Sequence, residues 1–149
     1  MSRDAEVIVL ARWSDEVMEP LTRDDPERTW KGRFVPISGH HGYEFGWALE
    51  FDKVHHRHGL LRHLESLAWP YPESVQVLLR DQDDECFGLW MFQQGRLLEV
   101  TIPGTERFHQ PAPPTEDYAP DPGVLRRTDG GGPLPEQTPE ALRDTRSPW

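Results

Sequence analysis

The clearest fold signal lies in residues 74–102, which read SVQVLLRDQDDECFGLWMFQQGRLLEVTI. The segment Ser74–Arg80 places Val75, Val77 and Leu79 on one face, which is typical of a strand that packs on a core. A polar loop leads to a second extended segment at Cys86–Gln93, and Gln94-Gly95 predicts a tight turn before a third at Arg96–Ile102. These signals predict a three-stranded antiparallel meander.

The residues before the meander predict further strands and one helix. Tyr43–Phe51 alternates cleanly, with large apolar side chains on one face, and therefore predicts a half-buried strand. Between His55 and Trp69 the leucines recur at spacings of three and four, which predicts an amphipathic helix that Pro70 ends. Weaker patterns predict extended segments at Glu6–Trp13 and Arg33–Ile37, and a loop or frayed helix at Ser14–Lys31.

Together these elements predict an α+β domain in residues 1–118, with one main helix packed on one face of a mostly antiparallel sheet. A split β-α-β arrangement is compatible with the pattern but not required by it. Ten of the fifteen prolines follow residue 102, together with three consecutive glycines at 130–132. Because proline and glycine discourage both helices and ladders, we predict that residues 119–149 form a flexible, disordered tail.

Composition limits the functional classes. The chain has 149 residues and a formal net charge of -10, and no cluster of basic residues is interleaved with aromatics, which disfavours direct nucleic-acid binding. No apolar run reaches the roughly 18 residues that a membrane helix needs. Cys86 is the single cysteine, so an intramolecular disulfide is excluded and we expect a reducing, cytoplasmic location. The acidic balance suits a basic protein partner.

The acidic loop Asp81, Asp83, Asp84 and Glu85 allows three interpretations: a solvated turn, an anionic patch that faces a partner, or a cation site. The chain carries no nucleophile elbow and no glycine-rich phosphate loop, and Cys86 falls inside a strand pattern, where a buried inert thiol is usual. We therefore expect no catalytic residues and no cofactor.

Histidines near the start of the predicted helix offer a second hypothesis. His55, His56 and His58 could hold a metal with one of the acids, because imidazole is the commonest metal ligand. No HExxH pattern completes the set, and surface or helix-cap positions explain these histidines equally well. A small metal-binding protein or metal-dependent enzyme is thus the alternative function.

Several short motifs follow one another in a fixed order between residues 40 and 117. They are His55-His56-Arg57, Pro72-Glu73-Ser74, Arg80 to Glu85, Glu85-Cys86-Phe87, Trp90, Gly95-Arg96-Leu97 and Pro114-Thr115-Glu116-Asp117. In this order they resemble the seventh immunity-protein family of bacterial polymorphic toxin systems. The departures are His55 in place of the family's Asn at the helix start, an N-terminal third without the family's acidic helix, and a longer tail.

The resemblance implies a small α+β protein that binds a cognate toxin and neutralises it. We expect a basic toxin surface, such as that of a nuclease, with Asp81, Asp83, Asp84 and Glu85 as rim or cleft contacts and Trp90 as a structural residue. Because immunity surfaces are specific to their partner, the resemblance does not transfer the identity of the toxin. An interaction module unrelated to toxins is a third interpretation.

Overall fold

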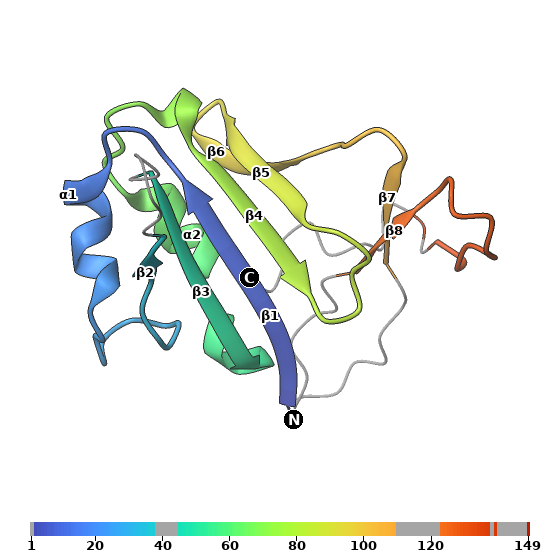
Figure 1. Cartoon of the computed structure of the whole chain (residues 1–149), viewed down its shortest axis with the longest axis horizontal. Coiled ribbons are helices and arrows are strands. Elements are labelled where there is room, and N and C mark those ends of the chain that lie inside the picture. Colours follow the sequence, from blue (N-terminus) through green and yellow to red (C-terminus); the bar gives the residue numbers. More distant parts are fainter. Residues whose placement is uncertain (1, 38–44, 110–122, 138, 140–148) are drawn as a thin grey trace.

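The computed structural model describes residues 2–37, 45–109, 123–137, 139 and 149. In this part of the chain the fold is α+β, as predicted, with a six-stranded antiparallel sheet and a separate two-stranded sheet (Figure 1). The strands are β1 (Ser2–Leu10), β2 (Val35–Pro36), β3 (Gly46–Lys53), β4 (Gln76–Asp81), β5 (Gly88–Gln93), β6 (Arg96–Val100), β7 (Thr105–Phe108) and β8 (Val124–Arg127). The helices are α1 (Asp15–Met18) and α2 (Leu60–Ser66), and the 3-10 helices are η1 (Glu19–Thr22), η2 (Val54–Arg57) and η3 (Pro72–Ser74).

The large sheet has the strand order β2-β3-β1-β4-β5-β6, with β1 near its centre. Because β3 and β4 both pair with β1 in antiparallel fashion, they run parallel to each other on either side of it. Helix α2 lies between them in sequence and behind the sheet in Figure 1, which makes the connection a split β-α-β unit. The predicted meander is confirmed, since β4 pairs with β5 and β5 with β6.

The main core lies between α2 and the face of the sheet turned toward it. The predicted alternation of β3 is confirmed over its described residues, because Trp47, Leu49 and Phe51 are buried while Glu50 is exposed. The apolar side of α2 closes this layer. Each such side chain stabilises the fold by about 1.5–3 kcal/mol when it is fully buried. The core also includes Ala5, Val7, Val9, Met18, Leu21, Trp30, Phe34, Leu60, Leu61, Leu64, Val75, Val77 and Leu79.

Glycine starts α2 because the chain turns sharply out of η2. Gly59 has φ 79°, a left-handed conformation that side chains other than glycine rarely adopt. A Cβ at this position would lie 2.5 Å from Oγ1 of Thr29, so the turn also requires the space that glycine leaves. The helix is shorter than predicted, because η2 takes up its first residues and Leu67 is already extended.

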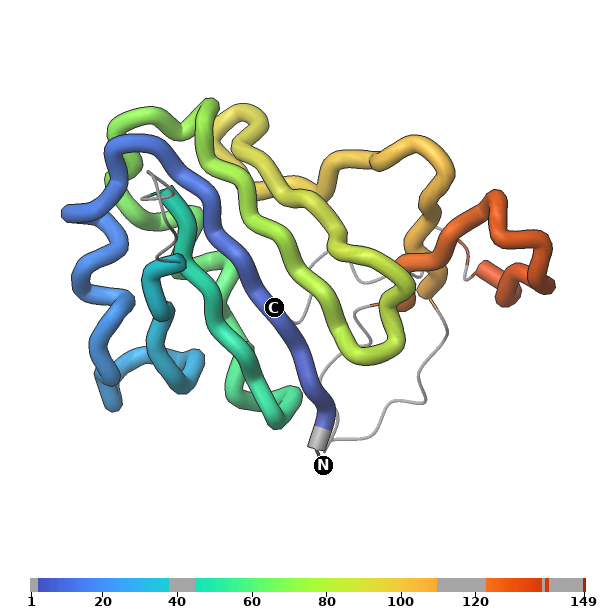
Figure 2. Tube along the Cα trace, viewed as in Figure 1, coloured from blue at the N-terminus to red at the C-terminus, as the bar shows by residue number. Residues whose placement is uncertain are grey.

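Part of the predicted flexible tail is folded. Strand β8 pairs with β7, and Trp149 is buried against Phe51 and over the guanidinium of Arg57. The prediction of a tail from residue 119, and with it the boundary at 118, is therefore wrong for 124–127 and for Trp149, because composition cannot reveal pairing with distant segments. Residues 119–122, 138 and 140–148 lie outside the described part of the chain. Figure 2 traces segment 128–137 beyond the two-stranded sheet.

Among the described residues, no helix is long and apolar enough to cross a membrane.

Candidate functional site

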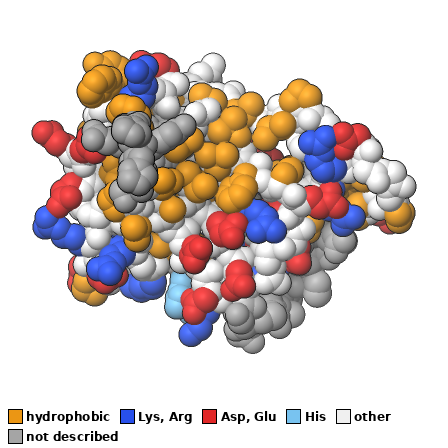
Figure 3. All heavy atoms as spheres, in the orientation of Figure 1, with side chains coloured by type: hydrophobic (Ala, Val, Ile, Leu, Met, Phe, Trp, Pro, Cys, Tyr) orange, Lys and Arg blue, Asp and Glu red, His pale blue; other side chains and the backbone are white. Residues whose placement is uncertain are grey.

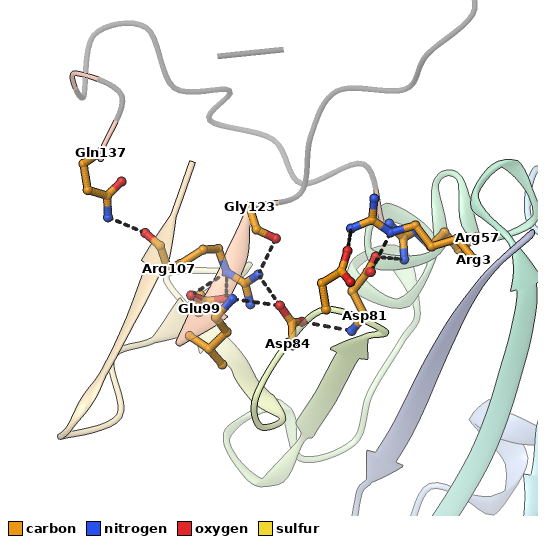
Figure 4. Close-up of polar contacts among 10 residues, drawn as sticks. Arg3, Arg57, Asp81, Asp84, Glu99, Arg107, Gly123 and Gln137 are labelled. Atoms are coloured by element: carbon orange, nitrogen blue, oxygen red, sulfur yellow. Dashed lines mark hydrogen bonds and ion pairs between the residues drawn. The ribbon is translucent and has the colours of Figure 1, made fainter. Parts of the chain in front are cut away.

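Two acids of the acidic loop at the end of β4, Asp81 and Asp84, are buried. Asp81 is 1 % exposed, and its carboxylate accepts hydrogen bonds from Nη1 of Arg57 at 2.5 Å and from Nε of Arg3 at 2.6 Å (Figure 4). Arg57 is itself fully buried, and burial lowers its pKa while the neighbouring Asp81 opposes that shift. Because a buried charge needs a buried partner, this pair acts within the fold.

Asp84 joins the two sheets. It is 4 % exposed and accepts hydrogen bonds from the backbone N–H groups of Asp81, at 2.9 Å, and Leu125, at 2.8 Å. Burial raises the pKa of Asp84, and these two hydrogen bonds oppose the rise. Arg107 on β7 lies 3.8 Å from Asp84 and forms an ion pair with Glu99 on β6 at 2.8 Å. The chain of charges in Figure 4 therefore ties β7 and β8 to the end of the large sheet.

The remaining two acids of the loop reach the surface. Asp83 has a side chain 55 % exposed and lies 3.2 Å from Arg3, and Glu85 pairs with Arg126 at 2.9 Å. The expectation that all four acids are rim contacts is thus wrong for Asp81 and Asp84, whose carboxylates are buried and bound inside the chain. Trp90 packs against the core, as expected of a structural residue.

The histidines of the metal hypothesis lie around η2 but do not converge on one point. The rings of His55 and His56 are stacked edge to face with centroids 4.5 Å apart, and Nδ1 of His56 lies 3.2 Å from Asp52. The residues described by the structure include no group of three or more potential metal ligands. No observation favours the metal-binding alternative.

A pocket of about 230 Å³ lies where the large sheet meets the small one. Glu99 and Arg107 line it together with Leu125 and the chain around Thr105. Burial raises the pKa of Glu99, while the guanidinium of Arg107 opposes that rise. Glu99 and Arg107 are thus matched to each other, and Glu106 is a further acidic residue of the lining.

The sheet face opposite α2, hereafter the outer face, carries an apolar band. It has no helix over it in the view of Figure 1, and Figure 3 shows hydrophobic side chains gathered over its centre. The band comprises two cross-strand rows of outward-pointing residues. The first row runs through all six strands: Val35, Ala48, Ile8, Leu78, Leu89 and Val100. The second row contributes Leu10, Met91 and Leu98.

The edges of the band are the most exposed. Val35 on edge strand β2 is 58 % exposed, Leu98 on edge strand β6 is 39 % exposed, and Leu10 between them is 36 % exposed. The central residues of the first row are half-buried, because side chains on neighbouring strands shield one another from solvent. The first row is therefore continuous across the sheet and accessible from solvent, whereas the polar Gln76 separates Leu10 from Met91 in the second row.

Acidic side chains lie along one side of this band, next to its first row, and Asp4, Glu6 and Glu50 are hereafter the acidic end, since they come toward one end of strands β1 and β3. Glu6 and Glu50 stand directly opposite each other on β1 and β3, while Arg80 on β4 pairs with Glu6 at 3.2 Å. Asp4 is exposed two residues before Glu6. Within the part of the chain that the structure describes, Glu50 makes no ion pair. Figure 3 shows acidic side chains below the hydrophobic centre.

No apolar outer face was predicted from the sequence, although the strands carry a pattern that indicates one. Strands with one solvated face alternate between apolar and polar residues, whereas strands covered on both faces are nearly continuous apolar runs. The runs VIVL at 7–10, VLL at 77–79 and LWMF at 89–92 are of the second kind. These three apolar runs indicate a sheet that has apolar side chains on both faces, so that the outer face is also suited to burial.

No protein-family model, no curated protein and no solved structure matches this chain. Its function therefore has to be inferred from the contacts and surfaces described above.

Proposed function

We propose that this protein binds another protein and, as an immunity protein, neutralises a toxin domain. The observation that carries the proposal is the apolar band on the outer face. Soluble domains rarely leave a contiguous apolar surface of this kind uncovered unless it binds something. A helix covers the opposite face and none covers this one among the described elements, so the band is available to a partner.

The resemblance to the immunity family supports the choice of a toxin as partner. Its best-matched motifs, Glu85-Cys86-Phe87, Trp90 and Gly95-Arg96-Leu97, belong to β5, β6 and the residues that flank them. These strands supply part of the outer face. The closing motif, Pro114 to Asp117, lies outside the described residues.

Neutralisation by this route requires a rigid platform. β1 is hydrogen-bonded on both sides, to β3 and to β4, so the middle of the outer face is held by the sheet. A rigid surface loses little conformational entropy on binding, which favours tight association. Docking over the catalytic cleft of a toxin would then block its substrate physically, with no chemical step.

The test is a toxicity rescue. Each protein domain encoded by the genes adjacent to this one is expressed with and without this chain, and binding is measured with a catalytically inactive form of any domain that arrests growth. Rescue with nanomolar binding is the expected result, since standard protein–inhibitor interfaces reach such affinities. Growth arrest that this chain does not relieve, together with no binding to the inactive domain, refutes the proposal.

A further inference from the structure

We infer that the outer face binds a protein surface that carries an apolar strip with lysine or arginine residues along one side of it. This inference rests on the proposed function and adds to it the place, the chemistry and the orientation of the interface. The interface inferred here is the outer face and not the acidic loop, because Asp81 and Asp84 of that loop are bound inside the fold.

The apolar part of the argument is the length of the band. Its first row crosses all six strands from Val35 to Val100 without a charged residue. Strands lie about 4.8 Å apart, so six of them span roughly 24 Å, which is the width of a protein interface rather than of a small ligand. The occupant is therefore a protein surface of comparable width.

The charged part of the argument is an unfavourable arrangement at the acidic end. Glu6 and Glu50 are direct cross-strand neighbours, and like charges in such positions destabilise a sheet. Arg80 compensates Glu6, but Glu50 makes no ion pair among the described residues. Basic side chains of a partner would remove this repulsion, so the acidic end complements a cationic surface.

The same charges disfavour the other occupants of an apolar face. Two copies of a chain with a net charge of -10 repel each other, which opposes a dimer through this face. Anionic lipid surfaces attract basic segments and repel acidic ones. A cationic protein is the occupant that both the apolar band and the charge favour.

The acidic end also fixes the orientation of the partner. Glu6, Glu50 and Arg80 share one cross-strand row, and the two apolar rows lie to one side of it. A partner with its basic residues along one side of its apolar strip can satisfy both parts of the face in only one orientation. Specificity would then come from the charges, and slow dissociation from the apolar contacts.

Glu50→Lys tests the charged part. This change removes the repulsion with Glu6, so the melting temperature should stay the same or rise, whereas a purely structural residue would lower it. Association with the inactive toxin domain should slow by about tenfold or more, because electrostatic steering raises association rates by about 10 to 1,000-fold. The matched control is Glu136→Lys, the same charge change at an exposed glutamate outside the large sheet.

Leu98→Gln tests the apolar part without changing the charge. Leu98 is 39 % exposed on an edge strand, so the fold should tolerate glutamine there. Dissociation should accelerate by about tenfold or more if its side chain becomes buried in the complex. Leu134→Gln is the matched control, since Leu134 is a 48 % exposed leucine outside the large sheet.

A second probe separates this inference from the proposed function. It is a labelled 18-residue amphipathic helix of leucine on one side and lysine on the other, compared with versions that carry glutamate for lysine or serine for leucine. We expect only the leucine–lysine peptide to bind, with amide shifts in β1, β4 and β5 and weaker binding to Glu50→Lys and Leu98→Gln.

Each outcome has one meaning. Peptide binding at the outer face without toxin binding sinks the proposed function and keeps the inference. If Glu50→Lys and Leu98→Gln still rescue cells from the toxin, and no peptide binds at this face, the proposed function stands and the inference is overturned. A dimer in sedimentation that Leu98→Gln dissociates assigns the face to a second copy and also overturns it.

Discussion

Replacing Asp81 with alanine should destabilise the fold far more than the same change at Asp83, two residues along the same loop. Asp81 is buried and holds both Arg57 and Arg3, whereas the side chain of Asp83 is 55 % exposed and pairs, among the described residues, with Arg3 alone. The comparison therefore measures what burial adds to an ion pair with nearly the same sequence context.

The expected size follows from what Asp81→Ala leaves behind. Arg57 would keep its charge at 0 % exposure, and its Nε and Nη2 atoms already lack hydrogen-bond partners within the described part of the chain. Breaking a buried pair costs about 3–5 kcal/mol, consistent with the attraction of about 4 kcal/mol between unit charges 4 Å apart at an effective dielectric constant of 20. Asp83→Ala should cost at most about 1 kcal/mol, as other exposed pairs do.

The free energy of unfolding of both variants is measured by urea titration, with tryptophan fluorescence as the signal. Trp149 lies over the Arg57 guanidinium and therefore reports on its surroundings. A double variant, Arg57→Met with Asp81→Leu, should recover much of the lost stability, since removing both charges leaves no uncompensated ion. If the free energy of unfolding of Asp81→Ala lies within about 1 kcal/mol of that of the unmodified chain, Asp81 is not a buried structural charge and the reasoning fails.

Three further predictions concern other parts of the structure. Burial lowers the pKa of His63, whose Nδ1 accepts a 2.8 Å hydrogen bond from Trp30, so stability should fall as the pH drops below the unfolded value of 6.5 toward the lower folded pKa. Urea titrations between pH 7 and 5 should show this loss, and His63→Gln should flatten it. Arg107→Met should weaken the anchoring of β7 and β8 through Glu99, so amide exchange there should accelerate by about tenfold or more while β1 stays protected; equal acceleration in both would contradict a local role. Burial raises the pKa of Cys86, so its alkylation by iodoacetamide at pH 7.5 should be slower than that of an unfolded control, and equal rates would count against the packing around it.

The local pattern of the sequence was enough to predict the large sheet. The alternation of β3, the meander from β4 to β6 and the leucine spacing of α2 are all confirmed, because strand and helix periodicities involve residues close in the chain. The helix start was placed too early because Gly59 sets it, and the need for glycine there depends on contact with Thr29.

The loop acids show where local pattern fails. Asp81, Asp83, Asp84 and Glu85 are alike in sequence, yet two are buried and two exposed. Asp81 is held by Arg57 and Arg3, which lie 24 and 78 residues from it in the chain, and Asp84 accepts a hydrogen bond from the backbone of Leu125, 41 residues away. No window of sequence contains these partners, so the acids could not be sorted before the fold was known.

The sequence by itself determined the α2 helix, the meander of β4 to β6 and the side of β3 and β4 that faces the core, because side-chain direction alternates along a strand whatever surrounds it. Only the tertiary structure decided that the outer face remains open, that β8 and Trp149 belong to the folded domain, and that Asp81 and Asp84 are internal. The physical reason is that burial depends on which distant segments pack together, and a charged or apolar side chain takes its role from those neighbours.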